Sequence, residues 1–179
     1  YNPTKAKELM AEAGYPNGFK TTITYRSSMN QDAPAAVQSY LKAIGIDVTL
    51  DPAPTARFST VTTGGWKNGM IIEPLMAAGT PSWLPKIVSM LSADSVTAKS
   101  TMRPPGWQEL LVKATRATDA KSKEDLSHQM IQMASDTAFV IPWAVYGRGE
   151  VVLARVHNFD WLFEGSFPTE TPADTWLSK

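Results

Sequence analysis

Apolar residues in the first fifty positions alternate between two spacings. They recur every three or four residues, as in a helix, then at every second residue, as in a strand, and this sequence of periods repeats once. The pattern predicts helices over 3–13 and 32–44 and strands over 19–25 and 46–50. Asn2 should cap the first helix, Gly14 and Gly45 should end the two helices, and Asp51-Pro52 should close the second strand. This order with short connections is typical of a sheet with crossover helices.

The middle of the chain gives weaker signals. A third helix is predicted over 56–63, although its threonines are poor helix formers. A buried strand is predicted over 70–76, with Pro74 bending its C-terminal end. Residues 79–85 should form a loop before a short helix around 87–91.

The second half begins with a polar stretch over 92–106, which ends in two prolines and a glycine and is predicted to be a linker. Two helices should follow, the first starting at Trp107 and the second opened by a capping box of Ser122 and Asp125. Two strands joined by a glycine-containing turn should then form a hairpin over 139–146 and 150–154.

Composition narrows the function. The chain has 179 residues, of which 43% are hydrophobic and 19% charged, enough apolar material for a real core. Basic and acidic residues number 17 each, so no net positive field exists to attract nucleic acid. Cysteine is absent, which excludes disulfides, thiolate metal sites and a cysteine nucleophile. We expect an α/β lobe over 1–154 and an irregular, aromatic segment over 155–179.

Few side chains suggest catalysis. His128 falls on the polar side of a predicted helix and is expected at the surface. His157 with Asp160 could supply the base and orienting acid of a serine-type hydrolase, although no serine stands in a nucleophile-elbow pattern. A His157 buried beside a serine hydroxyl would favour this alternative, and an exposed one would remove it. No motif predicts a metal or a cofactor.

Glu73 stands in an apolar strand, where an unpaired charge is costly. Its side chain should lie either on the wet face of an edge strand or at the mouth of a cleft, where strand ends of α/β sheets collect ligands. Trp66 and Trp83 flank this strand on predicted loops. A large aromatic ring on a loop is expected to pack against something, which can be the protein core, a partner or a ligand.

Three stretches carry a family resemblance. Residues 1–19, Tyr-Asn-Pro-Thr-Lys-Ala-Lys-Glu-Leu-Met-Ala-Glu-Ala-Gly-Tyr-Pro-Asn-Gly-Phe, closely resemble part of the extracellular solute-binding proteins of peptide-type ABC importers, which include dipeptide-, oligopeptide- and nickel-binding proteins. Residues 41–48 and 126–146 are similar to later helix-and-strand segments of the same family. The resemblance implies the C-terminal lobe of a type II periplasmic-binding-protein fold, a mixed sheet flanked by helices.

That family resemblance also implies a function. The chain should be a non-catalytic lobe that holds a small, peptide-like or other solute between two lobes and needs no cofactor. Its partners would be the N-terminal lobe of the same parent protein and an ABC permease, in the periplasm or at the outer face of the cytoplasmic membrane. The start at Tyr1, without an initiator Met or a signal peptide, is consistent with a piece of a longer protein. A second alternative, besides a hydrolase, is an interaction module docking through the aromatic tail.

The expected ligand-binding wall lies at the ends of the first and third strands. Its residues are Arg26, Ser27, Glu73, Pro74, Leu75, Met76, Ala78 and Trp83. In peptide-binding members of the family the central strand commonly runs into Gly-Trp and then an Asp that receives the peptide α-amino group. The matching stretch, 73–81, has neither, so the sequence predicts a ligand other than a short peptide with a free N-terminus.

Overall fold

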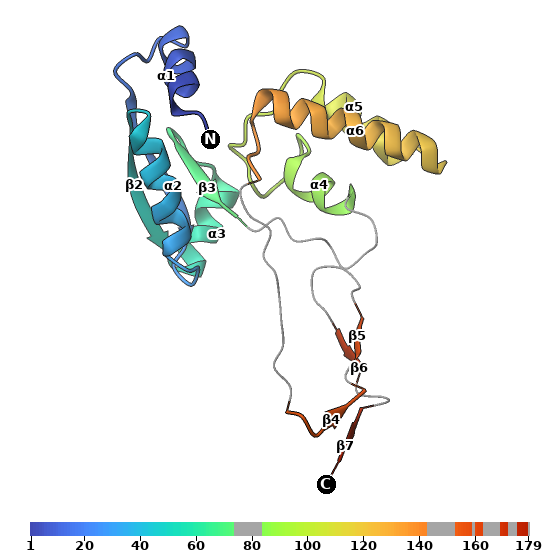
Figure 1. Cartoon of the computed structure of the whole chain (residues 1–179). Coiled ribbons are helices and arrows are strands. Elements are labelled where there is room, and N and C mark those ends of the chain that lie inside the picture. The colour runs from blue at the N-terminus through green and yellow to red at the C-terminus, as the bar shows by residue number, and fades with distance from the viewer. Residues whose placement is uncertain (74–83, 143–152, 159, 163–168, 172–174, 179) are drawn as a thin grey trace. The chain divides into compact units, whose positions relative to one another are not determined.

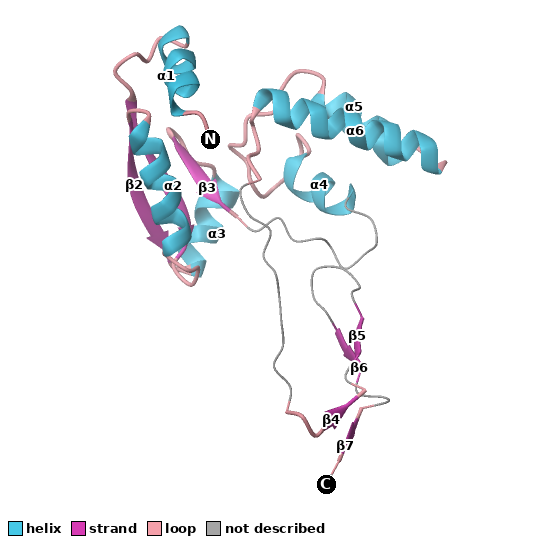
Figure 2. Cartoon of the chain, in the orientation of Figure 1, coloured by secondary structure: helices cyan, strands magenta, loops and turns pink. Residues whose placement is uncertain are grey.

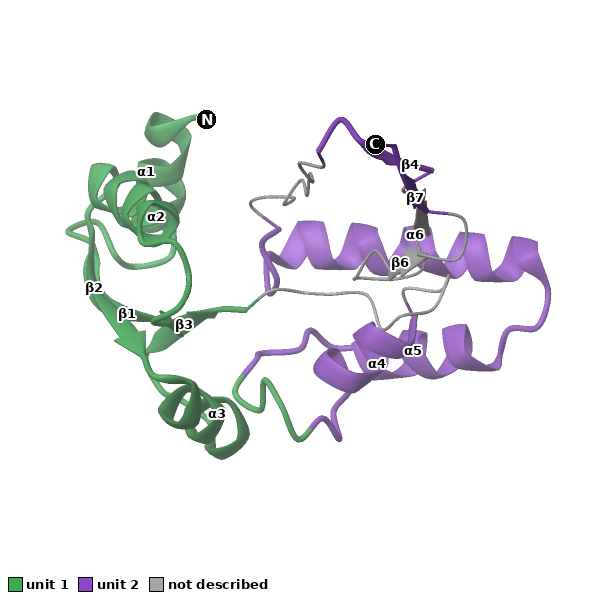
Figure 3. Cartoon of the chain, turned by 90° about the horizontal axis from the view of Figure 1, so that it is seen from below, with its two compact units in different colours: residues 1–74, 96–100 green, residues 75–95, 101–179 purple. Residues whose placement is uncertain are grey.

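The computed structural model describes six stretches of the chain, residues 1–73, 84–142, 153–158, 160–162, 169–171 and 175–178 (Figure 1). The chain divides into two compact units (Figure 3). Unit 1 comprises Tyr1–Pro74 and Val96–Ser100, and unit 2 comprises Leu75–Ser95 and Thr101–Lys179. The expected boundary between a lobe and a tail after residue 154 stays a prediction.

Unit 1 is a helix–sheet–helix sandwich. Its elements are α1 (Pro3–Glu12), β1 (Phe19–Arg26), α2 (Asp32–Ala43), β2 (Ile46–Ala53), α3 (Thr55–Gly64) and β3 (Gly69–Ile72). The three strands are parallel, in the order β2-β1-β3, with α1 and α2 on one face of the sheet and α3 on the other (Figure 3). An α/β fold with a sheet flanked by helices is thereby confirmed, including the third helix.

Local chemistry accounts for the ends of the first two helices. The side-chain oxygen of Asn2 accepts a hydrogen bond from the backbone N–H of Lys5 at 3.0 Å, as an N-cap should. Gly14 and Gly45, just beyond the two helices, have φ of +87° and +93°, the left-handed region that glycine enters without strain. The cap and both glycine stops are therefore confirmed.

The second and third strands end at different residues from those predicted. β2 continues through Asp51-Pro52 to Ala53, because it is an edge strand of the described sheet, where proline is tolerated. β3 ends at Ile72, so Glu73 follows the strand instead of lying within it. The rest of the predicted strand, 74–76, lies outside the described residues.

The core of unit 1 lies between the sheet and the first two helices. Alternate strand residues are buried there, and partly buried residues of the two helices pack on them. The strand residues are Ile23, Tyr25, Ile46 and Val48, and the helix residues include Met10, Val37 and Leu41. The period of two in the strands and of three to four in the helices thus produces one apolar layer.

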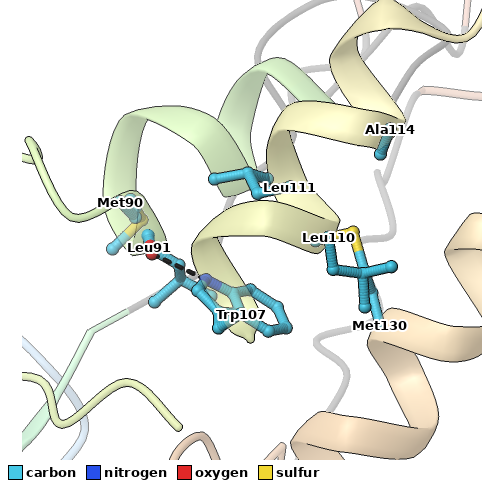
Figure 4. Close-up of a cluster of buried hydrophobic side chains, with 7 residues drawn as sticks. All are labelled: Met90, Leu91, Trp107, Leu110, Leu111, Ala114 and Met130. Carbon is cyan, nitrogen blue, oxygen red and sulfur yellow. Dashed lines mark hydrogen bonds between the residues drawn. The ribbon is translucent and has the colours of Figure 1, made fainter. Parts of the chain in front are cut away.

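Unit 2 holds the remaining helices, α4 (Leu84–Leu91), α5 (Trp107–Arg116) and α6 (Ala120–Thr137) (Figure 2). Their core consists of Met90, Leu91, Trp107, Leu110, Leu111, Ala114 and Met130 (Figure 4). Trp107 is only 2% exposed, and its indole N–H donates to the carbonyl oxygen of Leu91 at 2.8 Å. This bond ties the start of α5 to the end of α4.

Hydrogen bonds within unit 2 hold both ends of the predicted linker over 92–106. The guanidinium of Arg103 donates to the carbonyl oxygens of Leu91 and Thr101, each at 2.9 Å. The backbone N–H of Ala93 donates to the side chain of Gln108 at 2.7 Å. Charged and polar side chains therefore anchor a stretch whose polarity alone is typical of a linker.

The start of α6 differs from the predicted capping box. The helix begins at Ala120, and the carboxylate of Asp119 accepts a hydrogen bond from the backbone N–H of Ser122 at 2.8 Å. Ser122 therefore lies in the first turn as a donor, and Asp125 pairs with Lys121 at 3.3 Å. The prediction that Ser122 caps this helix is wrong, because Asp119 takes that place three residues earlier.

The C-terminal part of the chain also departs from its prediction. Residues 139–142 and 153–154, the described ends of the predicted hairpin, are not strands, and its middle, 143–152, lies outside the described residues. Two short antiparallel pairs follow, β4 (Val156–His157) with β7 (Trp176–Leu177), and β5 (Asp160–Leu162) with β6 (Thr169–Thr171). The segment expected to be irregular thus contains short strands. Among the described residues, no helix is long and apolar enough to cross a membrane.

Candidate ligand-binding site

The candidate site lies at the carboxyl edge of the parallel sheet in unit 1. Because the three strands run in the same direction, their C-terminal ends meet at one edge, where α/β proteins bind ligands. Tyr25 pairs with Ile72 across β1 and β3, so the next residues along, Arg26 and Glu73, are neighbours. The strand register therefore brings together two predicted site residues that stand 47 positions apart.

Two contacts fix the side chain of Arg26. Its Nη2 donates to Oε1 of Glu73 at 3.3 Å, and its Cζ lies 4.5 Å from the centroid of the Phe58 ring. Phe58 belongs to α3 and is completely buried, so the guanidinium covers its ring while attracted to the π face. The side chains of Arg26 and Glu73 are 32% and 24% exposed, which makes this a half-buried ion pair that solvent can still reach.

Glu73 keeps one carboxylate oxygen unused. Its Oε2 is buried and has no hydrogen-bond partner within the part of the chain that the structure describes. A buried acceptor without a donor typically costs about 1–3 kcal/mol, so such atoms are rare in folded proteins. The edge of the sheet therefore holds a buried acceptor that still lacks a donor among the described residues.

Ser27 adds a hydroxyl next to this pair. Its backbone N–H donates to the carbonyl oxygen of Ala53 at 2.8 Å, which extends the β1–β2 pairing past the end of β1. The residue itself is exposed. The structure thus places Arg26, Ser27 and Glu73 together, whereas the other predicted site residues lie outside the described residues: Pro74, Leu75, Met76, Ala78 and Trp83.

A second charged cluster on the same face of the sheet was missed by the sequence analysis. Asp51 pairs with Arg57 and accepts a hydrogen bond from the hydroxyl of Thr24 at 3.0 Å. The Arg57 hydrogen bond lowers the pKa of the Asp51 carboxyl from its ordinary value. Arg57 precedes Phe58, so the cluster fixes the start of α3 and with it the ring beneath Arg26. Strand alternation, which puts Thr24 and Asp51 on one face, was the available signal.

Trp66 lies away from this site. Its indole N–H donates to the carbonyl oxygen of Gly69 at 3.0 Å, and its backbone N–H donates to the hydroxyl of Ser100 at 2.7 Å. Gly69 begins β3, so the ring is held at the opposite end of that strand from Glu73. Hydrogen bonds within the protein therefore hold Trp66 in place, and the residue is half-buried.

His157 meets a serine, as the hydrolase alternative requires in part. Its Nε2 lies 3.0 Å from the hydroxyl of Ser178, and its ring stacks on Trp176 with centroids 4.1 Å apart. Both partners lie on or beside β7, so the hydrogen bond links two short paired strands. The side chain of Asp160 lies outside the described part of the structure, and no other described residue is seen to orient the imidazole. His128 is exposed on α6, as predicted.

Metal binding finds no support in the described residues either. Within them, no three His, Asp or Glu side chains stand close enough together to hold an ion. At the sheet edge, Arg26 and Glu73 offer hydrogen bonding and ion pairing.

Part of the chain matches a known protein family. Residues 1–82 match the model of the bacterial extracellular solute-binding proteins, family 5, middle region. This part of the chain, slightly less than half of it, resembles that family. Two relatives are glutathione-binding proteins GsiB. The protein of Escherichia coli strain K12 is 46% identical over 48 residues, which cover 26% of this chain and 9% of the relative. That of Pectobacterium atrosepticum is 44% identical over 50 residues, covering 27% and 10%.

Solved structures extend the likeness to nearly the whole chain. A dipeptide-binding protein from Pseudoalteromonas sp. SM9913, in complex with Met-Leu, matches with a TM-score of 0.74 and 20% identity over 99% of this chain and 36% of its own. The periplasmic binding protein DppA from Helicobacter pylori, in complex with the peptide STSA, matches with a TM-score of 0.64 and 28% identity over 75% and 27%. The fold is therefore that of type II periplasmic binding proteins. The chain spans only 9% to 36% of the length of these four relatives.

Proposed function

We propose that residues 1–154 form one lobe of a solute-binding protein that captures a small ligand and delivers it to an ABC importer. The observation that carries this proposal is the half-buried pair of Arg26 and Glu73 at the carboxyl edge of a parallel sheet. It stands in a chain whose first 82 residues match the model of a family of extracellular solute-binding proteins. No bond is made or broken in this function.

The proposed mechanism is closure of two lobes about a hinge around the ligand. This chain supplies one wall, in which Arg26 and Glu73 fix polar groups of the ligand and Ser27 offers a hydroxyl. The proposal extends the wall to the neighbouring residues already named from the sequence, Pro74, Leu75, Met76, Ala78 and Trp83. Leu75 and Met76 would provide apolar contact.

The proposed partners follow from the same role. They are the N-terminal lobe of the same parent protein, which closes on the ligand, and a permease of the ABC type in the membrane. The working location is the periplasm or the outer face of the cytoplasmic membrane, which fits the extracellular family. The related proteins are named for glutathione and for peptides, which supports a peptide-like ligand class.

Calorimetry with a panel of peptides and small solutes tests the proposal on the full-length gene product and on this chain. The full-length product should bind one of them tightly. This chain should bind no tighter than about 1 mM, near −4 kcal/mol, because half the contacts are missing while the entropy of association is still lost. Micromolar binding by this chain would show that it is not half a site. Failure of the full-length product to bind any solute would count against the proposal itself.

Neither alternative function gains support from the comparisons. The hydrolase would need His157 to activate the hydroxyl of Ser178, yet the family whose model matches residues 1–82 is one of solute-binding proteins. The interaction module would need the aromatic tail as its docking surface, and the solved structure that covers 99% of this chain is a dipeptide-binding protein. We therefore retain solute capture alone.

A further inference from the structure

The unpartnered oxygen of Glu73 restricts which chemical group of a ligand can bind at this site. Oε1 already accepts a hydrogen bond from Arg26 at 3.3 Å, whereas Oε2 is buried and unpartnered among the described residues. A carboxylate is an acceptor only, with room for several donors on its two oxygens. The group that completes this site is therefore a hydrogen-bond donor.

The charge of that donor follows from Arg26. Its guanidinium carries a positive charge that already compensates the carboxylate. It cannot move away without exposing Phe58, which is completely buried beneath it. An ammonium bound to Glu73 would be attracted by the carboxylate but repelled by the nearby guanidinium, and it would also lose its water. A neutral N–H or O–H loses far less hydration and meets no such repulsion.

We infer that Oε2 of Glu73 accepts a hydrogen bond from a neutral donor of the ligand, an amide N–H or a hydroxyl, and that this site disfavours a free ammonium. The inference rests on the proposed function and adds the chemical class of the ligand group that binds at this edge. It assigns Glu73 and Arg26 a joint role: Glu73 accepts the hydrogen bond, and the positive charge of Arg26 favours a neutral donor over a cationic one.

The experiment uses two small probes of similar size, acetamide and methylammonium chloride. The ¹⁵N-labelled chain is titrated with each in turn, and the NMR signals of Arg26, Ser27 and Glu73 are followed. Acetamide should shift these signals saturably, with a dissociation constant at least fivefold lower than that of methylammonium. The variant Asp47→Asn is the matched control and should titrate like the parent chain. Asp47 is an exposed carboxylate on β2 whose partner across the ladder is Lys20, far from the carboxyl edge.

Two variants separate the roles of the pair. Glu73→Leu removes the acceptor and should weaken acetamide binding at least tenfold. Arg26→Met keeps an unbranched apolar cover over Phe58 but removes the positive charge, so the preference should reverse and methylammonium should bind more tightly than acetamide. Dispersed amide signals verify that each variant folds. If Glu73→Leu does not fold, the reversal of preference in Arg26→Met is sufficient to test the inference.

Three results would overturn the inference: methylammonium binding as tightly as acetamide, an unchanged order of preference in Arg26→Met, or no saturable shift near Glu73 with acetamide. None of them decides whether the full-length gene product captures a solute, which calorimetry measures separately. A full-length product that binds its solute while the chain shows any of these results refutes the neutral-donor site alone.

Discussion

Gly18 and Gly45 approach each other so closely that a Cβ on Gly18 would overlap the backbone carbonyl of Gly45. The first residue precedes β1 and the second precedes β2, and the strands pair from their first residues, Phe19 with Ile46. Gly18 also has a φ of +74°, which residues with side chains rarely adopt. The start of the sheet therefore depends on two turns that pack backbone against backbone.

Gly18→Ala should destabilise the protein by about 3 kcal/mol or more, because a backbone clash adds to the strain of a positive φ. The measurement is urea unfolding followed by far-ultraviolet circular dichroism. Gly14→Ala is the matched control. Its φ is +87° but nothing lies within 4 Å of the added Cβ, so only the conformational cost of about 1–2 kcal/mol applies. Equal losses in the two variants would mean that the Gly18–Gly45 contact is looser than the structure has it.

Asp51 should contribute to the pH dependence of stability. Its hydrogen bond with Arg57 lowers the pKa of the folded carboxyl below its ordinary value of 3.8. A lowered folded pKa gives stability that is complete above the unfolded pKa and lost as the pH falls through the folded pKa. Asp51→Asn should therefore be less stable than the parent at pH 7, with the difference shrinking below about pH 4.

Thermal unfolding between pH 7 and pH 3 measures this effect. Asp47→Asn, on the same strand but with a carboxylate 71% exposed, serves as the control and should change stability little at any pH. A difference between parent and Asp51→Asn that stays constant down to pH 3 would contradict the assigned pKa shift of Asp51.

Two substitutions of Trp107 should separate the contributions of its hydrogen bond and of its packing to the free energy of unfolding. Trp107→Phe loses the donor to Leu91 but keeps a ring, and because Arg103 still donates to the same carbonyl, we expect a loss of about 1–2 kcal/mol. Trp107→Ala leaves a cavity in the core of unit 2 and should cost about 3–5 kcal/mol. Trp176→Phe changes a ring that is 52% exposed and should fall within about 0.5 kcal/mol of the parent in the same unfolding measurement. Similar losses for Trp107→Phe and Trp107→Ala would place the main contribution in the hydrogen bond.

The cap of α6 gives a direct comparison between two neighbouring residues. Asp119→Ala removes the carboxylate that accepts from the backbone N–H of Ser122, so it should lower the melting temperature. Ser122→Ala keeps that N–H and should lower the melting temperature by less than half as much. A larger effect from Ser122→Ala would restore the capping box predicted from the sequence.

Sequence periodicity located the helices and strands of the first fifty residues because each was bounded by a strong local signal. Asn2, Gly14 and Gly45 act through backbone geometry within one turn of the chain, which sequence reveals directly. The end of β2 was predicted too early because tolerance of Pro52 depends on edge position, a property of the assembled sheet. Asp119 and Ser122 are both good capping residues, and local sequence did not separate them.

The geometry of the candidate site depends even more on tertiary structure, which local sequence does not reveal. Arg26 and Glu73 were each expected at a strand end, but their contact depends on β1 and β3 being neighbours in the order β2-β1-β3. The packing of Phe58 beneath Arg26 depends on α3 covering that face of the sheet. Tertiary placement decides both, and so it also decides which carboxylate oxygen stays unpartnered.

The anchored connection over 92–106 has a consequence for attack by proteases. A polar surface stretch of this length is ordinarily where cleavage occurs, since a protease needs several residues to unfold locally. Here Arg103 holds the carbonyl of Leu91, and Ser100 and Lys99 bond to Trp66 and Thr62 of unit 1, with Lys99 donating its backbone N–H at 3.3 Å. Opening this stretch for cleavage therefore requires breaking contacts in the packed units. Its digestion should follow the stability of those units instead of the flexibility of a loop.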